Sequence, residues 1–178
     1  MKRAGSIMVL ICVVLAGCSS DSTALRDYLD EVMRSNETFA GLVGEQRQWR
    51  GEHEPLLGTT EFSWDGAHAQ IERIVAAIET EVQRLANVDA PEAAADLRKH
   101  TLDSYETTAE VFRRQIEVFE LIERISSMRE EPQADPAAIQ ALAERYEEIQ
   151  QDLEVLAQLT SEQVALSTAE RVRLAETL

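Results

Sequence analysis

The sequence predicts an all-α protein, and the placement of its helix breakers carries that prediction. All seven glycines lie at or before Gly66, and beyond that point only Pro91, Pro132 and Pro136 interrupt the chain. The stretches between these breakers are rich in Ala, Glu, Leu, Gln and Arg, which favour helix, and they lack alternating β-branched runs. A length of 178 residues with 44% hydrophobic and 28% charged residues is typical of one globular domain.

Four helices are predicted, at about residues 23–49, 67–86, 91–130 and 136–177. Each carries apolar residues spaced mainly three or four apart, the repeat of one helix face, and the first helix also has a gap of seven. Proline in the first turn marks the third and fourth helices, after Asp89 and Asp135, which are suited to capping free N–H groups. The stripe of the first helix comprises Leu25, Leu29, Val32, Phe39, Leu42, Val43 and Trp49. The stripe of the second comprises Ile71, Ile74, Val75, Ile78, Val82 and Leu85.

Short connections predict that neighbouring helices are antiparallel. We therefore expect an elongated antiparallel up-down four-helix bundle occupying residues 23–178. A three-helix antiparallel coiled coil, with the first two segments less regular, is the alternative. The fourth helix has a seam of the coiled-coil type, which would pack on the third helix or on another chain. That seam comprises Ile139, Leu142, Tyr146, Ile149, Leu153 and Leu156.

The first 17 residues have the pattern of an export signal. Lys2 and Arg3 precede an apolar run at residues 7–16, which is too short for the roughly 20 residues of a membrane-spanning helix. The run ends in the tetrad Leu15, Ala16, Gly17, Cys18. This tetrad resembles the lipobox of bacterial lipoproteins. An ordinary secretory signal with an incidental cysteine is the alternative.

The resemblance implies that Cys18 is the site of lipid attachment. Its sulfur would receive a diacylglycerol, the chain would be cut before it, and its new amino group would receive an acyl chain. Residues 18–22 would then form a short polar tether, and no other cofactor is expected. Because Cys12 lies in the removed segment, Cys18 would be the one cysteine left, and lipidation would account for its thiol. Two or more acyl chains give stable anchoring.

The same resemblance predicts where the protein resides. It would be exported and membrane-anchored, facing the periplasm or the cell exterior. Because Ser19 and not Asp follows Cys18, an outer membrane is favoured if the source has one. The formal net charge is −16, and cleavage before Cys18 would remove two basic residues and no acidic one, giving −18. Nucleic acid is excluded as a partner, because its binders need a basic surface.

No catalytic motif is present, so we do not expect an enzyme. The sequence lacks Gly-x-Ser-x-Gly, His-Glu-x-x-His, a phosphate loop and the Glu-x-x-His pairs of di-metal bundles. His53, His68 and His100 are expected at the surface, and no metal site is predicted.

The long connection at residues 50–66 is the best candidate for a partner contact. It lies at the pole expected to be distant from the membrane. The aromatic residues in and next to it would contact an envelope protein or, alternatively, plug the end of the bundle. The candidate contact residues are Trp49, His53, Phe62 and Trp64.

The function predicted from these observations is an interaction or scaffolding role in the cell envelope. The chain resembles, in general style only, the small helical-bundle lipoproteins of bacteria, and that resemblance implies no residue-level activity. A ligand-binding or metal-binding helical bundle is the alternative.

Overall fold

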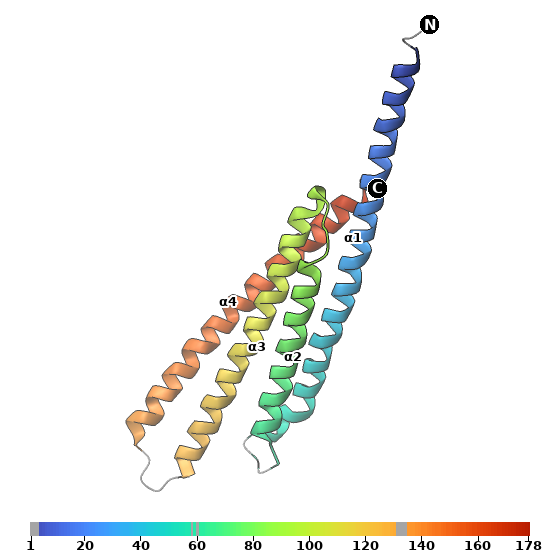
Figure 1. Cartoon of the computed structure of the whole chain (residues 1–178). Helices are drawn as coiled ribbons and strands as arrows, with labels where there is room; N and C mark the ends of the chain where they lie inside the picture. The colour runs from blue at the N-terminus through green and yellow to red at the C-terminus, as the bar shows by residue number, and fades with distance from the viewer. Residues whose placement is uncertain (1–3, 58, 60, 131–134) are drawn as a thin grey trace.

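Four long helices packed side by side make up the fold (Figure 1). The structure is a computed structural model that describes residues 4–57, 59, 61–130 and 135–178; residues 4–21 and 130 are described by their backbone. The helices are α1 (Ala4–His53), α2 (Trp64–Ala86), α3 (Ala95–Glu130) and α4 (Pro136–Ala175). Within the described residues no strand occurs. The predicted elongated antiparallel up-down four-helix bundle is confirmed, and the three-helix alternative is not adopted.

The connection between α1 and α2 is shorter than the sequence predicted. α1 continues through Gly51 to His53, and the short 3₁₀ helix η1 (Glu54–Leu56) follows it directly. α2 begins at Trp64 because the Ser63 side chain accepts a hydrogen bond from the Gly66 N–H at 3.0 Å, which caps the helix. The predicted connection at residues 50–66 therefore lies largely within helices.

The starts of α3 and α4 differ in how they are capped. Asp135 caps α4 as predicted, accepting from the Ala137 N–H at 2.9 Å with Pro136 in the first turn. The expected cap by Asp89 is wrong, because the 3₁₀ helix η2 (Glu92–Ala94) precedes α3 and Pro91 is its N-cap, with no side-chain hydrogen bond. Proline has no side-chain oxygen that could accept a capping hydrogen bond. The segment therefore starts as a 3₁₀ turn, which is tighter than an α-helical turn.

The core lies toward one end of the bundle and centres on α2. The predicted stripe of α2 is buried throughout, against the first turns of the packed part of α1 and the N-terminal half of α3. The last turns of α4 join this core through Leu174, which is 1% exposed. From α1, η2 and α3 the core takes Leu25, Tyr28, Leu29, Val32, Ala94, Leu97, Tyr105, Ala109 and Phe112.

α4 packs mainly on α3, so the predicted seam is used within the chain. Polar pairs join these helices, and they include an ion pair between Arg145 and Glu117 at 3.5 Å. The hydroxyls of Thr101 and Ser167 are 2.8 Å apart, and Nδ1 of His100 is 2.8 Å from Oε1 of Gln163. The C-terminal part of α1 packs on α2. α1 and α4 remain apart over much of their lengths, and α2 and α3 lie between them in Figure 1.

The up-down topology brings alternate connections and the chain termini to opposite ends of the bundle. The turn from α2 to α3 and the C-terminus lie at one end, where the N-terminal part of α1 extends beyond the other helices (Figure 1). We call this end the proximal pole. The ends of α1 and α3 and the starts of α2 and α4 lie at the opposite end, the distal pole (Figure 1). Among the described residues, no helix has a stretch that is both long enough and apolar enough to span a membrane.

Candidate functional site

A cavity of about 200 Å³ lies inside the distal half of the bundle, and we call it the distal cavity. It is partly open to solvent and is bounded by the end of α1, by Glu54, Leu57 and Phe62, by the second half of α3 and by the first half of α4. Its walls combine four aromatic rings with aliphatic side chains and three glutamine amides. The lining residues are Gln46, Trp49, Arg50, Glu54, Leu57, Phe62, Gln115, Val118, Phe119, Ile122, Tyr146, Gln150 and Leu153.

An aromatic cluster closes one side of the distal cavity. Phe62 is only 8% exposed and packs edge-on against Trp64, with ring centroids 4.7 Å apart. Phe119 of α3 meets both rings, at 6.1 Å from Phe62 and 6.3 Å from Trp64. Such edge-to-face pairs stabilise a fold beyond the area they bury. Two of the four predicted partner-contact residues, Phe62 and Trp64, therefore pack into the bundle end.

The other two predicted contact residues stack on each other at the end of α1. The rings of Trp49 and His53 lie 4.4 Å apart and nearly parallel, and Nδ1 of His53 is 2.8 Å from the Trp49 carbonyl oxygen. Both side chains are partly exposed. Trp49 also lines the distal cavity, so it connects the surface of this pole to the interior.

Gln46 is the polar residue most deeply placed in the cavity wall. It is 4% exposed, and its Oε1 atom has no hydrogen-bond partner. A buried amide oxygen without a partner costs about 1–3 kcal/mol relative to a paired one. Gln46 follows Leu42 by four residues and precedes Trp49 by three. It therefore occupies a position of the apolar stripe, which is the sequence signal that could have identified it.

The three histidines lie on three different helices. His53 is at the end of α1, His68 is half-buried in α2 with an unpartnered Nε2 atom, and His100 in α3 contacts Gln163 of α4. In the part of the chain that the structure describes, no three metal-ligating side chains come together.

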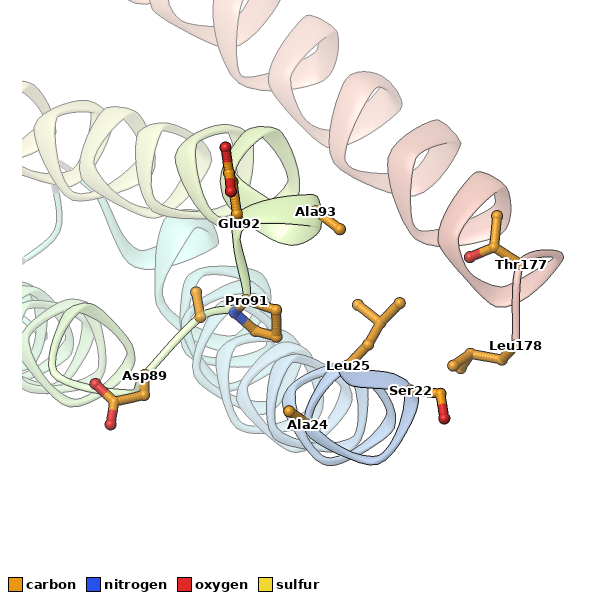
Figure 2. A pocket seen from close by; sticks show the side chains of 10 residues that line it. Ser22, Ala24, Leu25, Asp89, Pro91, Glu92, Ala93, Thr177 and Leu178 are labelled. Carbon is orange, nitrogen blue, oxygen red and sulfur yellow. The ribbon is translucent and has the colours of Figure 1, made fainter. Parts of the chain in front are cut away.

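A second hollow, of about 720 Å³, opens at the proximal pole (Figure 2). Figure 2 shows the side chains of Leu25 and Pro91 directed into it, with Leu178 at its opposite side. Asp89 and Glu92 lie at its margin. This hollow is wide and open, and its walls come from α1, the turn before α3 and the C-terminus.

A third hollow, a groove of about 460 Å³, runs between α1 and α4 over α3. Tyr105 forms part of its floor and is 1% exposed. Burial raises the pKa of the Tyr105 hydroxyl to about 12, so the group stays protonated and donates a hydrogen bond to Oδ1 of Asn36 at 2.9 Å. This groove exists because α1 and α4 do not close on each other, which no linear pattern predicts.

The predicted lipid-attachment tetrad lies in α1 beyond the packed part of the bundle. The backbone of residues 15–18 is helical, and residues 18–22, predicted as a tether, belong to the same helix. Among the α1 residues whose side chains the structure describes, Leu25 is the first in the core. Comparison with known proteins gave no match: no family model, no curated protein and no solved structure is significantly similar to this chain.

Proposed function

We propose that the protein is a lipid-anchored, extracytoplasmic helical bundle that acts through contact with an envelope partner. The lipobox-like tetrad ending in Cys18 is the motif on which this rests. The observation that supports it best is the extension of α1 beyond the bundle at the proximal pole (Figure 1). Because the core begins at Leu25, cleavage before Cys18 would leave the described packing intact.

The proposed anchor would also orient the bundle on the membrane. A lipid on Cys18 would hold the proximal pole, with its C-terminus and α2–α3 turn, next to the bilayer. The 36 residues of α3 rise about 54 Å, so the distal pole would stand roughly that far from the surface. A net charge of −18 on the cleaved chain would favour standing away from an anionic leaflet.

Incorporation of a clickable fatty acid in cells tests the anchor. We expect the wild-type chain to be labelled and membrane-associated, and Cys18→Ala to lose both properties. Cys12→Ala is the matched control, because it removes a thiol six residues earlier within the leader and should keep both. Equal labelling of wild type and Cys18→Ala would contradict the proposal.

In-cell photo-crosslinking tests the proposed partner contact at the distal pole. A photoreactive residue replaces Glu61, which is exposed in the connection before α2, and a control replaces Gln151, which is exposed on α4. A contact made by the distal pole gives a discrete adduct from position 61 that is absent from position 151. The same products from both positions, or none from position 61, would contradict a contact at this pole.

A ligand-binding bundle is the second candidate function. The distal cavity, with its aromatic and aliphatic walls, favours it.

A further inference from the structure

We propose that a second copy of this chain docks the outer edge of its α4 into the groove between α1 and α4. The groove is the hollow of about 460 Å³ whose floor includes Tyr105, and we call it the α1–α4 groove. This contact uses neither Cys18 nor the distal pole, so its test is independent of the function proposed above. The outer edge of α4 comprises Asp152, Val155, Leu159 and Leu166.

The lining of the α1–α4 groove is positively charged in an otherwise acidic chain. Arg47 lies at its distal end and Arg171 at its proximal end, because α1 and α4 run in opposite directions. None of the described residues that line it is acidic, although the chain has 33 acidic and 17 basic residues. In the part of the chain that the structure describes, neither guanidinium pairs with a carboxylate. The distal cavity and the proximal hollow, by contrast, both have acidic residues in their walls.

Apolar side chains lie between the two arginines. These are Phe39, Ala40, Val43 and Val164. The groove therefore complements an apolar helix edge that carries a carboxylate.

The outer edge of α4 has these properties and packs on nothing within the described chain. Val155 is 59% exposed, Leu159 is 42% exposed and Leu166 is 46% exposed. Their spacings of four and seven residues place them on one face of the helix. Leu166 lies about 200° around the helix from Val164 of the groove, so one copy cannot fill its own groove with this edge. Figure 1 shows α4 at the margin of the bundle, and Asp152 lies one turn before Val155 and is exposed.

Contacts through α3 relate the heights of α1 and α4 along the bundle. Tyr105 of α3 donates to Asn36 of α1 at 2.9 Å. One turn nearer the proximal pole, about 6 Å away, Thr101 of α3 contacts Ser167 of α4 at 2.8 Å. Asn36 and Ser167 therefore serve as reference points for the two sides of the groove.

A neighbour at the same height brings its carboxylate to the distal arginine. Arg47 follows Asn36 by eleven residues, which is about 16 Å toward the distal pole. Asp152 precedes Ser167 by fifteen residues, about 22 Å, and starts from a level about 6 Å nearer the proximal pole. The two groups therefore stand level when both copies point the same way.

The apolar residues follow the same register. With the same rise per residue, Val155 of the neighbour stands level with Gly44, and Leu159 stands level with Ala40. A Cβ atom at Gly44 would meet nothing within 4 Å, so the packing of a single chain does not use this space. The edge of a second α4 would cover it.

The contact joins unlike surfaces, so each copy keeps one free groove and one free edge. Such heterologous contacts continue into rows or close into rings. Equal heights put all proximal poles on the same side, as attachment to one membrane would require. Because few side chains take part, the contact is weak in dilute solution, and confinement to a surface would strengthen it.

Cysteine crosslinking in cells tests the register. Two full-length chains with different tags are co-expressed, one with Gly44→Cys and the other with Val155→Cys, and whole cells are treated with a short, membrane-permeant bis-maleimide. We expect an adduct of the two chains. Each variant expressed with itself should give none, because the contact joins unlike surfaces. Chains without an added cysteine give the background from Cys12 and Cys18.

A matched control places the cysteine on the next residue of α4. Glu154 is exposed, stands at nearly the same height as Val155 and lies about 100° around the helix. Glu154→Cys should therefore give no adduct with Gly44→Cys. Circular dichroism verifies that each variant folds.

Charge reversal tests the pairing of the two copies. Arg47→Glu in the Gly44→Cys chain should lower the yield of adduct about fivefold, the effect of one exposed ion pair. Asp152→Arg in the Val155→Cys chain should restore it. Leu159→Asp in the Val155→Cys chain should remove the adduct, because it places a charge among the apolar residues of the groove.

Four results would overturn the proposal. The first is a mixed pair that gives no adduct above background. The second is an equal yield from either variant with itself or from Glu154→Cys. The third is an adduct that charge reversal leaves unchanged. The fourth is crosslinking of Gly44→Cys to a different protein in cells that lack the Val155→Cys chain, because another partner would then occupy the groove.

Discussion

Tyr105 of α3 donates its hydroxyl hydrogen to Oδ1 of Asn36 in α1 at 2.9 Å, and its ring stacks on Phe39 at 4.1 Å. These contacts connect two helices that otherwise meet mainly through α2. They also close the floor of the groove between α1 and α4. One buried phenol therefore adds a direct link between α1 and α3 to the packing of α1 on α2.

Tyr105→Phe should lower the free energy of unfolding by about 1 kcal/mol, because it removes the hydrogen bond and keeps the ring stacking. Urea denaturation followed by circular dichroism measures the change. Tyr146→Phe, which removes a hydroxyl from a half-buried tyrosine elsewhere, should cost less than about 0.5 kcal/mol. Equal losses in the two variants would show that the bond to Asn36 contributes nothing specific.

Alkaline pH should destabilise the protein through the same residue. Burial raises the pKa of Tyr105 from 10.0 to about 12, so the folded state holds the proton more tightly than the unfolded chain does. The contribution of protonated Tyr105 to the free energy of unfolding is therefore complete below pH 10. It is lost as the pH rises from 10 to 12. The slope reaches at most about 1.4 kcal/mol per pH unit.

Urea denaturation at intervals between pH 9 and 12 measures this loss. Tyr105→Phe should lose stability less steeply than the wild-type chain over that range. Burial also raises the pKa of Tyr28. The stability of Tyr105→Phe should therefore still fall with rising pH, but less steeply. Superimposable pH profiles of wild type and Tyr105→Phe would contradict this assignment.

The hydroxyl pair between Thr101 and Ser167 should couple α3 to α4. Thr101 donates to the Leu97 carbonyl at 2.8 Å, so its only hydroxyl hydrogen is used and Ser167 must donate to it. Thr101→Val and Ser167→Ala should each cost about 1–2 kcal/mol, because each leaves a buried partner unpaired. The double variant should cost less than the sum, with a coupling of about 0.5–1.5 kcal/mol measured by urea denaturation. Additive losses would mean that the two hydroxyls do not interact.

The sequence predicted the parts of the fold that local patterns determine. The stripe on α2 is buried as expected, and the Asp135–Pro136 signal marks the start of α4. The predicted end of the first helix, at about residue 49, was wrong because α1 continues to His53. A single glycine such as Gly51 destabilises a helix by only about 1 kcal/mol and does not have to end it. The Arg50–Glu54 pair also spans this position.

The distal cavity could not be predicted from the sequence pattern, for a different reason. Its walls come from α1, α3 and α4. Periodicity identifies the apolar face of each helix, but the relative shift and splay of the helices decide which faces meet. Gln46 was detectable as a polar residue within a stripe, whereas its lack of a partner depends on how α3 and α4 pass it.

Arg84 should contribute more to stability than any fully exposed arginine. It contacts Glu31 of α1, and its Nη2 lies 2.6 Å from Oε1 of Glu81, which is 7% exposed. Arg84→Met would leave Glu81 buried without its partner, at a cost of about 2 kcal/mol after allowance for the partial exposure of the arginine.

Arg113→Met is the matched control for Arg84→Met. Its partner Glu79 is exposed and its partner Glu110 is partly exposed, and neither is buried, so it should cost less than about 1 kcal/mol. Thermal and urea denaturation compare the two. Adding Glu81→Gln to Arg84→Met should recover part of the loss, because it removes the unpaired charge. Equal costs for the two arginine variants would contradict this explanation.

Phe62 distinguishes a structural role of the α1–α2 connection from a contact role. Its side chain is 8% exposed between Trp64 and Phe119. Phe62→Ala should therefore lower the free energy of unfolding by about 3 kcal/mol, the usual cost of emptying a buried aromatic site. Glu61→Ala, at the exposed neighbouring position, should change it by less than about 0.5 kcal/mol.

Urea denaturation measures both variants, and the crosslink from position 61 provides the second readout. If Phe62 plugs the bundle, Phe62→Ala loses stability and the adduct weakens only as far as the fold does. If Phe62 instead contacts the partner, stability stays within about 0.5 kcal/mol of wild type while the adduct is lost. The second outcome would require Phe62 to leave its site between Trp64 and Phe119. Because that site buries most of the ring, we expect the first.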